Sequence, residues 1–448
     1  METPRALYTA LAFALLPWLP LRLWWRARRE PGYGIAIGER FGRYGDAEVA
    51  SPLFWIHAVS VGETRAAMPL IARLKTAYPK ATILLTHMTA TGRETGRALF
   101  GAGVIQAWLP YDFPFAVRAF FAHFRPVAGC LIETELWPNL IAEARQRNIP
   151  LFLVNARLSE RSARAYARFA SLTRPMTGRL AGVAAQSPDD AARMAAIGAS
   201  APIVTGNLKF DIALPDSARA LGTEFRTRFG AARQVWVAAS TREGEEALLL
   251  DALARTPLAQ QTLLVLVPRH PQRFAVIAEM LRARGVPFVR RSDNLPVPAD
   301  IGVVLGDSMG EMLAYYAAAD LAFIGGSLLP LGGQNLIEAL AAGTPVLIGP
   351  HTFNFSDATT GAIAVGAALR VADADALIAA VAELFRVAPA REAMREAAVA
   401  FHSAHRGAAD RLQKWLAPQL ARRGLDTTAD ANNGATDERS RRRPGSPA

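Results

Sequence analysis

Cysteine and histidine are scarce in this sequence: Cys130 is the only cysteine among 448 residues, and there are seven histidines. A single cysteine cannot form an intrachain disulfide, which excludes a disulfide-stabilised secreted domain and favours a reducing compartment. So few cysteines and histidines also argue against a zinc cluster. Cys130 lies in the apolar run Val127–Ile132, where we expect a buried thiol with a packing role only.

Acidic residues are outnumbered, because 39 Asp and Glu face 50 Lys and Arg, for a net charge of +11. This surplus favours anionic partners, namely nucleic acid, anionic lipid or a phosphorylated substrate, although it could also serve solubility alone. The basic residues are spread along the chain, with no stripe of them interleaved with aromatic residues. We therefore expect no nucleic-acid partner, and a basic nucleic-acid or membrane-surface binding protein is kept only as a distant alternative.

Long hydrophobic runs are lacking except near the start of the chain. Ala6–Trp25 is almost wholly apolar, but it is interrupted by Pro17, Pro20 and Arg22 and followed by Arg26, Arg28 and Arg29. About 20 apolar residues can span a bilayer, and tryptophans and arginines at one end favour the interface and the cytoplasmic side. A cleaved signal peptide has the opposite order of charge and apolar run. We expect residues 1–30 to form an uncleaved membrane anchor that either spans the bilayer or lies in its interface.

Short apolar runs with strand character alternate with helical patterns through the rest of the chain. This alternation predicts parallel sheets covered by helices on both faces, that is, an α/β protein. The first series of expected strands is Leu53–Ser60, Ala81–Met88, Val104–Leu109, Val127–Glu133, Pro150–Asn155, Gly182–Gln186 and Pro202–Thr205. The second series is Gln234–Ala239, Thr262–Val267, Pro287–Val289, Ile301–Leu305, Leu321–Ile324 and Pro345–Ile348.

The two series indicate two Rossmann-like domains. We expect an N-terminal domain over residues 31–210 and a C-terminal domain over residues 211–423, with a linker near Asp211–Leu221, where Pro215 stands and large apolar residues are few. Ligands of such domains bind at the carboxyl ends of the strands, so a cleft between the two domains is the expected site. The segment Gly424–Ala448 is polar and rich in Arg and Pro, which predicts a disordered tail.

Glycine-rich loops in the second half suggest a nucleotide site. The strand Leu321–Ile324 leads into Gly325-Gly326-Ser327 and then Gly332-Gly333-Gln334-Asn335, before a helix expected over Leu336–Ala342. Such loops let backbone N–H groups approach a phosphate at a helix N-terminus. Glu338 could accept hydrogen bonds from a ribose. A plain tight turn remains the competing interpretation.

Two other loops of the second half should reach the same edge of the sheet. Pro268-Arg269 follows one expected strand, and Arg269 could meet a phosphate or a base. Gly306–Glu311 follows another strand and opens a helix. Asp307 has no accompanying Asp-x-Asp pair at its strand end, so we expect no metal, and the leaving-group charge would fall to helix ends and to Arg and Lys.

In the first half, Ser60 ends the first expected strand and Glu63 follows it. Glu63 is the candidate general base for a hydroxyl nucleophile, but Ser60-x-x-Glu63 is also the spacing of a capping box. Glu133 closes another strand and heads an acidic pair. Lys209 is the candidate countercharge for an acidic sugar or phosphate, with an ion pair to Asp211 as the alternative.

Several long motifs, in order, resemble one enzyme family. They are His57–Glu63, Glu133–Asn139, Asn155–Ser159, Gly206–Asp211, Val267–Pro271, Gly306–Glu311 and Gly349–Phe355. Together they resemble the 3-deoxy-D-manno-octulosonic acid (Kdo) transferases of Gram-negative bacteria, from the anchor to about residue 415.

The resemblance implies a GT-B glycosyltransferase fold and transfer of Kdo from CMP-Kdo to the lipid A precursor, lipid IVA, in lipopolysaccharide core biosynthesis. It places the enzyme at the cytoplasmic face of the bacterial inner membrane and implies no metal and no cofactor, since CMP-Kdo is a substrate. Glu63 matches the catalytic base, and Glu133 and Lys209 match transition-state stabilisers. The positions that match the CMP site are Pro268, Arg269, Met309, Gly310, Glu311, Asn335, Leu336, Ile337 and Glu338. Gly38–Gly42 matches a segment near the acceptor.

The expected reaction is a single displacement that inverts the anomeric carbon. Glu63 would deprotonate the acceptor hydroxyl while Lys209 faces the carboxylate of Kdo. The main alternative within the enzymes is a GT-B transferase or epimerase that uses another sugar nucleotide, such as a UDP-linked amino sugar.

Overall fold

The computed structural model describes residues 3–45 and 49–422. The chain divides into two compact units: the first comprises Met1–Asp211 and Gly407–Ala448, and the second comprises Ile212–Arg406. The tail expected over Gly424–Ala448 lies outside the described residues.

The first unit is built on a seven-stranded sheet, and every printed strand pair in it is parallel. Its spatial order is β3 (Ile105–Trp108), β2 (Thr82–His87), β1 (Leu53–His57), β4 (Ala128–Ile132), β5 (Leu151–Ala156), β6 (Gly182–Ala185) and β7 (Ile203–Val204). The order reverses at β1, because the next strands along the chain lie on one side of it and β4 lies on the other.

Helices cover both faces of this sheet because its strands are apolar on both faces. Phe54 and Ile56 of β1 face one core, whereas Leu53 and Trp55 face the other, as the alternation of side chains along a strand requires. The first core is closed by α3 (Val61–Ala66), α4 (Met68–Ala77) and α20 (Ala408–Ala421); the second is closed by α6 (Pro114–Phe124), α7 (Pro138–Gln146), α9 (Ala170–Thr177) and α10 (Pro188–Ala196). Besides the two N-terminal helices described below, the unit contains α5 (Ala90–Phe100), α8 (Glu160–Arg168) and the 3-10 turns η1 (Pro31–Gly34), η2 (Ile37–Phe41), η3 (Gly101–Gly103) and η4 (Leu208–Asp211).

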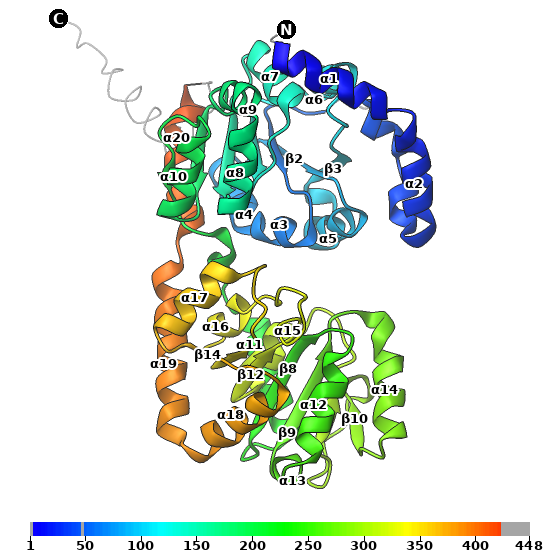
Figure 1. Cartoon of the computed structure of the whole chain (residues 1–448), viewed down its shortest axis with the longest axis vertical. Helices are drawn as coiled ribbons and strands as arrows, with labels where there is room; N and C mark the ends of the chain where they lie inside the picture. The colour runs from blue at the N-terminus through cyan, green and yellow to red at the C-terminus, as the bar shows by residue number, and fades with distance from the viewer. Residues whose placement is uncertain (1–2, 46–48, 423–448) are drawn as a thin grey trace, which may run out of the picture. The chain divides into compact units, whose positions relative to one another are not determined.

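The expected anchor forms two helices, α1 (Thr3–Leu15) and α2 (Trp18–Arg29), drawn in blue in Figure 1. No single helix of the described chain is long and apolar enough to cross a membrane; taken together, α1 and α2 satisfy the length and composition, but they are bent by 58°. The break falls at Pro17, which lacks the N–H that a continuous helix would use. α1 is fixed to the unit by its Thr9, whose hydroxyl lies 3.1 Å from Oδ1 of Asn139 in α7.

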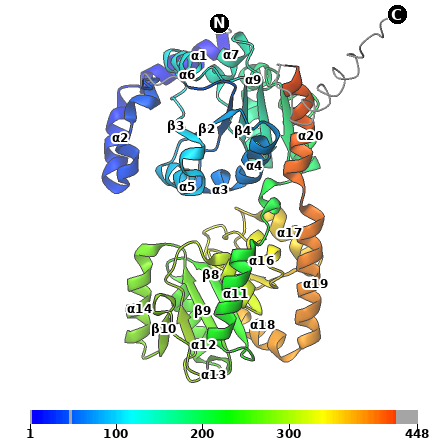
Figure 2. The same ribbon diagram turned by 180° about the vertical axis from the view of Figure 1, so that it is seen from behind.

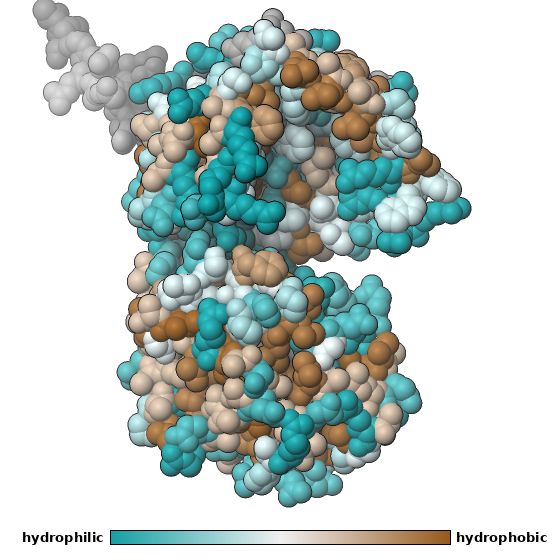
Figure 3. All heavy atoms as spheres, viewed as in Figure 1, coloured by the Kyte–Doolittle hydropathy of each residue, from teal (hydrophilic) through white to brown (hydrophobic). Residues whose placement is uncertain are grey.

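The outer faces of α1 and α2 are apolar and exposed. Figure 3 shows hydrophobic residues gathered over α1. The exposed large side chains of the two helices are Leu7, Leu11, Phe13, Leu15, Trp18, Leu21, Trp24 and Trp25. Two arginines stack on tryptophans of the same helix, with Arg28 4.0 Å from the ring of Trp24 and Arg29 4.1 Å from that of Trp25.

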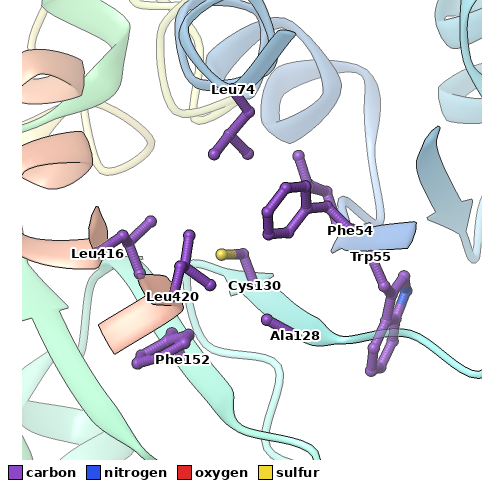
Figure 4. A pocket seen from close by; sticks show the side chains of 9 residues that line it. Phe54, Trp55, Leu74, Ala128, Cys130, Phe152, Leu416 and Leu420 are labelled. Atoms are coloured by element: carbon purple, nitrogen blue, oxygen red, sulfur yellow. The ribbon is translucent and has the colours of Figure 1, made fainter. Parts of the chain in front are cut away.

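The last described helix, α20, belongs to the first unit, although the sequence analysis assigned its residues to the second domain. Asp211 holds the start of α20 against the first unit. Its carboxylate accepts hydrogen bonds from the N–H groups of Gly407 (2.5 Å), Ala408 (3.2 Å) and Ala409 (2.5 Å). Leu416 and Leu420 then pack over the sheet beside Cys130 (Figure 4). They line a small apolar cavity of about 10 Å³.

Cys130 is buried in this core, as expected. Burial raises the pKa of its thiol to about 12, because a thiolate is poorly solvated among apolar groups. A thiol in this state is a poor nucleophile.

The second unit contains another seven-stranded sheet, with all its printed strand pairs parallel. Its spatial order is β10 (Phe288–Arg290), β11 (Val303–Leu305), β9 (Leu263–Pro268), β8 (Val235–Thr241), β12 (Leu321–Ile324), β13 (Val346–Ile348) and β14 (Ala368–Arg370). The edge strand β14 was not predicted, because only Ala368 of its three residues is buried and no apolar run marks it.

Helices again cover both faces of the sheet (Figures 1 and 2). One core is closed by α12 (Glu245–Ala254), α14 (Phe274–Ala283) and α18 (Ala374–Arg386). The others are α11 (Asp216–Phe229), α13 (Leu258–Gln261), α15 (Met312–Ala318), α16 (Ile337–Ala341), α17 (Ser356–Ala364), α19 (Ala388–His405) and the turns η5 (Pro271–Arg273) and η6 (Arg291–Asp293).

The linker expected near Asp211–Leu221 is shorter than predicted. Helix α11 begins at Asp216, directly after Pro215, and it buries Phe225 and Phe229 in the second unit. Its first turns carry few large apolar residues, which made this stretch resemble a loop.

Candidate active site

Glu63 lies in the first turn of α3, immediately beyond the carboxyl end of β1. One carboxylate oxygen accepts the Val59 N–H at 2.7 Å, and the other lies 3.0 Å from the hydroxyl of Ser60. Ser60 in turn caps α3. Glu63 is therefore both the candidate base and a member of the capping box at the start of α3. The hydrogen bonds of the capping box fix the position of its carboxylate.

The protonation of Glu63 is unusual for a carboxyl group. Its pKa is raised to about 7, first by burial and then by the negative charges of Glu133 and Glu135, while the hydrogen bonds from Val59 and Ser60 lower it. A buried carboxylate is poorly solvated, and neighbouring carboxylates disfavour its charged form further. A carboxyl group that titrates near neutral pH is suited to general base catalysis.

Glu133 and Lys209 form an ion pair, with Nζ 2.8 Å from Oε1. Glu133 follows β4 and has a left-handed backbone, with φ of 63°, and its N–H donates to the carbonyl of Val154 in β5. A left-handed conformation in a residue other than glycine is costly and is found most often at functional sites. Here it turns the side chain out of the strand and toward Lys209.

Two asparagines hold the segment that carries Lys209. Asn155, whose φ is 52°, accepts the Leu208 N–H at 2.9 Å through Oδ1. Asn207 accepts the Lys209 N–H at 3.0 Å. Asp211, the alternative partner of Lys209, uses its carboxylate to cap α20.

Glu135 is a member of this cluster that sequence reasoning noted only as half of an acidic pair. It accepts the Trp137 indole N–H at 2.9 Å, and its Oε2 lies 3.8 Å from Nε2 of the buried His57. His57 lies at the end of β1 and contacts Thr86 of β2 through Nδ1. The motif spacing placed Glu133 and Glu135 on one loop, but only the fold shows that both charges act on Glu63.

The segment Gly38–Gly42 lies at the neighbouring strand ends. Glu39 accepts the backbone N–H of Trp108, the last residue of β3, at 2.7 Å and pairs with Arg93 at 3.3 Å. The guanidinium of Arg40 is buried and lies 3.8 Å from the ring of Trp108. This turn is therefore fixed at the carboxyl edge of the first sheet.

In the second unit, the residues that match a CMP site lie at the carboxyl ends of three strands. Pro268 ends β9. The backbone N–H of Arg269 donates to the Thr241 carbonyl at 3.0 Å, and Nε of Arg269 lies 3.3 Å from Oε1 of Gln334. Met309, which is 57% exposed, and Gly310, with φ of 81°, follow β11.

The acidic members of this group are held by their own neighbours. Glu311 pairs with Arg291 at 2.8 Å. Glu338 accepts a hydrogen bond from Asn335 at 3.1 Å. Leu336 and Ile337 are fully buried, so neither side chain faces a ligand in this structure.

The glycine loop does not present its N–H groups as the sequence analysis expected. The carboxylate of Glu245 accepts hydrogen bonds from the N–H groups of Gly326 (2.6 Å), Ser327 (3.0 Å) and Leu328 (3.0 Å). A side chain of the protein thus occupies the position predicted for a phosphate. In addition, α16 spans only five residues and α15 seven, so their dipoles are small.

Within residues 3–45 and 49–422, no group of three or more His, Cys, Asp or Glu side chains is arranged to hold a metal ion. Asp307, considered above as a possible ligand, instead accepts hydrogen bonds from the backbone and hydroxyl of Ser292 at 2.9 and 2.7 Å.

Comparisons with known proteins address both units. Residues 36–212 match a family model described as 3-deoxy-D-manno-octulosonic-acid transferase, and residues 248–401 match a model of glycosyl transferases group 1. The chain is similar to the 3-deoxy-D-manno-octulosonic acid transferase of Bordetella pertussis, with 47% identity over 92% of this chain and 99% of that one. It is 38% identical to the transferase of the same name from Haemophilus influenzae, over 93% and 99% of the two chains.

Among solved structures, Anabaena HepE in complex with UDP has a similar fold, with a TM-score of 0.56 and 15% identity over 82% of this chain and 99% of that one. The two parallel sheets thus form a GT-B-like glycosyltransferase architecture. Since two full-length relatives exceed 30% identity, the chain belongs to the 3-deoxy-D-manno-octulosonic acid transferase family of glycosyltransferases.

Proposed function

We propose that this enzyme transfers Kdo from CMP-Kdo to the lipid A precursor, lipid IVA, in lipopolysaccharide core biosynthesis. The transfer would occur at the cytoplasmic face of the inner membrane. The observation that carries the chemical part of the proposal is the environment of Glu63, a buried carboxyl group whose pKa of about 7 suits a base.

In the proposed reaction Glu63 takes the proton of the acceptor hydroxyl, and the hydroxyl oxygen bonds to the anomeric carbon of Kdo. The bond from that carbon to the CMP phosphate oxygen breaks, and CMP leaves with the electron pair. Attack from the face opposite CMP inverts the anomeric centre.

Lys209 and Glu133 are proposed to stabilise the transition state. The anomeric carbon gains positive character as CMP leaves, while the adjacent carboxylate of Kdo keeps its negative charge. Lys209 would face that carboxylate, and Glu133 would orient the ammonium group through the 2.8 Å ion pair. Ion pairs of this kind act strongly where water is excluded, and both side chains are largely buried, with exposed fractions of 17% and 22%.

The residues proposed to bind the CMP part are Pro268, Arg269, Met309, Gly310, Glu311, Asn335, Leu336, Ile337 and Glu338. Their position at strand carboxyl ends, where ligands of parallel α/β sheets bind, supports this assignment. We propose that the reaction needs no metal and no cofactor.

Because the proposed acceptor of Kdo is a lipid, the enzyme should act at a membrane surface. The helices α1 and α2 support this location. Eight exposed apolar side chains on these helices and the arginines at the end of α2 suit the interface of an anionic bilayer. The segment Gly38–Gly42 follows these helices and is proposed to contribute to acceptor binding.

The test is transfer of Kdo from freshly generated CMP-Kdo to tetraacylated lipid A precursor with EDTA present, followed by mass spectrometry. We expect a mass gain of one or more Kdo units in EDTA, and a loss of more than about 100-fold in turnover for Glu63→Gln with unchanged binding of CMP. Near-normal turnover of this variant would reject Glu63 as the base. A wild-type enzyme that bound UDP in preference to CMP would favour the other sugar nucleotides.

A further inference from the structure

The turn Thr241–Glu246, which ends β8 and opens α12, was not among the predicted site residues. Two fully buried carboxylates hold it. Glu245 accepts the Arg242 N–H at 2.9 Å in addition to the three N–H groups of the glycine loop. Glu246 accepts a hydrogen bond from the Thr241 hydroxyl at 3.0 Å and pairs with Arg273 at 2.9 Å.

These contacts join the ends of two neighbouring strands. Because Glu245 binds both its own turn and residues 326–328 after β12, the two loops form one rigid structure. Gly325 and the turn are in close contact: a Cβ on Gly325 would lie 2.6 Å from the Thr241 Cα. Burying a carboxylate is costly unless all its oxygens are satisfied, so this arrangement indicates that the position of the turn matters.

The side chain that the turn presents is Arg242. It is partly exposed, and among the described residues its guanidinium makes no hydrogen bond or ion pair, whereas Arg273 nearby is neutralised by Glu246 and, at 3.9 Å, by Glu243. Positive charge is concentrated around this turn. The pKa of His270 is lowered first by burial and then by the charges of Arg269, Arg242 and Arg273.

Arg242 and Arg269 flank Gly326. A Cβ on Gly326 would lie 3.4 Å from Cγ of Arg242 and 3.1 Å from Nε2 of Gln334, and Gln334 contacts Arg269. The site also lies at the topological switch point of the sheet, because β8 is flanked by β9 on one side and by β12 on the other. Ligands of open α/β sheets bind at this point, and paired guanidinium groups are suited to a phosphate.

We propose that Arg242 binds the phosphate of the donor nucleotide beside Arg269, and that Glu245 is the positioning residue for it. This inference rests on the proposed function only in the identity of the nucleotide. The phosphate is held by Arg242 at the end of β8 and Arg269 at the end of β9, and the N–H groups of the glycine loop serve to fix Glu245.

The test compares Arg242→Ala with the wild type by isothermal titration of the full-length protein with CMP and with cytidine. We expect CMP to bind about 10- to 100-fold more weakly, as for a lost charge-assisted hydrogen bond, and cytidine to bind equally well. Arg282→Ala removes an exposed arginine on α14 and should change neither affinity. Unchanged CMP affinity, or an equal loss for CMP and cytidine, would overturn the assignment.

The Kdo carboxylate is the other anion that Arg242 could bind. Inhibition by CMP and the KM for CMP-Kdo together distinguish binding of the phosphate from binding of this carboxylate. If the phosphate is the ligand, Arg242→Ala weakens CMP as a competitive inhibitor by the same factor as it raises KM for CMP-Kdo. A raised KM with unchanged inhibition by CMP would assign Arg242 to the sugar and reject the phosphate.

Positioning by Glu245 is tested with Glu245→Gln and the double variant. The amide introduced by this substitution has one acceptor oxygen where the carboxylate has two, so we expect weaker CMP binding with retained cytidine binding, and little further loss on adding Arg242→Ala. Fully additive losses would show that Glu245 acts independently of Arg242 and would reject it as the positioning residue. Wild-type protein that binds UDP but not CMP would reject the proposed donor, and the same variants titrated with UDP and uridine would still test Arg242; wild-type protein that binds no nucleotide would contradict both proposals.

Discussion

At the residue scale, the protonation of Glu63 is subject to two opposing influences. Its carboxylate caps the Val59–Ser60 turn, which favours the charged form, while burial and the charges of Glu133 and Glu135 favour the neutral form. The second influence is the larger, so the group is partly protonated at neutral pH.

This balance gives a pH dependence. The charge of Glu135 raises the Glu63 pKa, so Glu135→Gln should lower that pKa and let the Glu63 carboxyl group lose its proton at lower pH. We expect the acidic limb of kcat/KM, near pH 7 in the wild type, to move to lower pH by a few tenths of a unit to about one unit. Glu160→Gln, on the exposed surface of α8, is the matched control; an acidic limb that stayed in place in Glu135→Gln would contradict the electrostatic account.

Glu63 should also lower the free energy of unfolding at neutral pH. The pKa of Glu63 is about 7 in the folded state and about 4.5 without that environment, so the folded protein loses stability as pH rises from about 4.5 to 7. Glu63→Gln keeps an acceptor for Val59 and removes the buried charge. We expect its free energy of unfolding to exceed that of the wild type by on the order of 1–3 kcal/mol at pH 8, and the difference to shrink toward pH 4.5, as measured by urea denaturation at both pH values.

The sequence predicted Glu63, Glu133 and Lys209 as site residues because each follows a strand end or a tight turn, and the structure brings Glu133 and Lys209 into contact. It did not identify Glu245. The available signal was a pair of glutamates at a strand end, but three partners of Glu245, Gly326, Ser327 and Leu328, lie more than 80 residues away. Contacts at that separation follow from strand order, which local spacing does not specify.

At the element scale, the apolar runs predicted thirteen strands at positions where the structure has strands, since buried parallel strands are apolar on both faces. They could not assign α20. Its pattern of buried residues, Leu412, Leu416 and Leu420, indicates an amphipathic helix that packs on a sheet, but not which of two sheets it covers.

The position of α20 predicts a local effect on stability. Leu416 is almost fully buried and borders the cavity beside Cys130. Leu416→Ala would enlarge that cavity and should cost about 2–5 kcal/mol. Hydrogen exchange followed peptide by peptide should show faster exchange in β1, β4 and β5 and no change in β8, β9 and β12. Lys414→Ala, on the exposed side of the same helix, should leave all these peptides unchanged; faster exchange in the second unit would show that α20 stabilises both.

At the scale of the whole molecule, the exposed apolar surface is concentrated at α1 and α2. A bend of 58° between them and the break at Pro17 allow both apolar faces to lie along an interface. The sequence predicted an apolar anchor from composition and showed Pro17 within it, but the attachment of Thr9 to α7 depends on a tertiary contact.

This arrangement predicts that tryptophans of α2 contribute to lipid binding. Trp24 and Trp25 are each 52% exposed, and replacing both with Ala should weaken binding to vesicles of phosphatidylethanolamine and phosphatidylglycerol by about tenfold or more. Cosedimentation measures this effect. Leu248→Ala, which removes an exposed apolar side chain from α12, is the control, and equal binding of the double variant and the wild type would exclude α2 from the interface.

The return of α20 also affects how the protein is made. Synthesis proceeds from the N-terminus, and domains generally fold as units when their residues have emerged. The first unit is discontinuous, because its last helix follows all of Ile212–Arg406. During translation the core beside Cys130 stays open until α20 has been synthesised. The second unit, although later in the sequence, is therefore the first that can complete its fold on the ribosome.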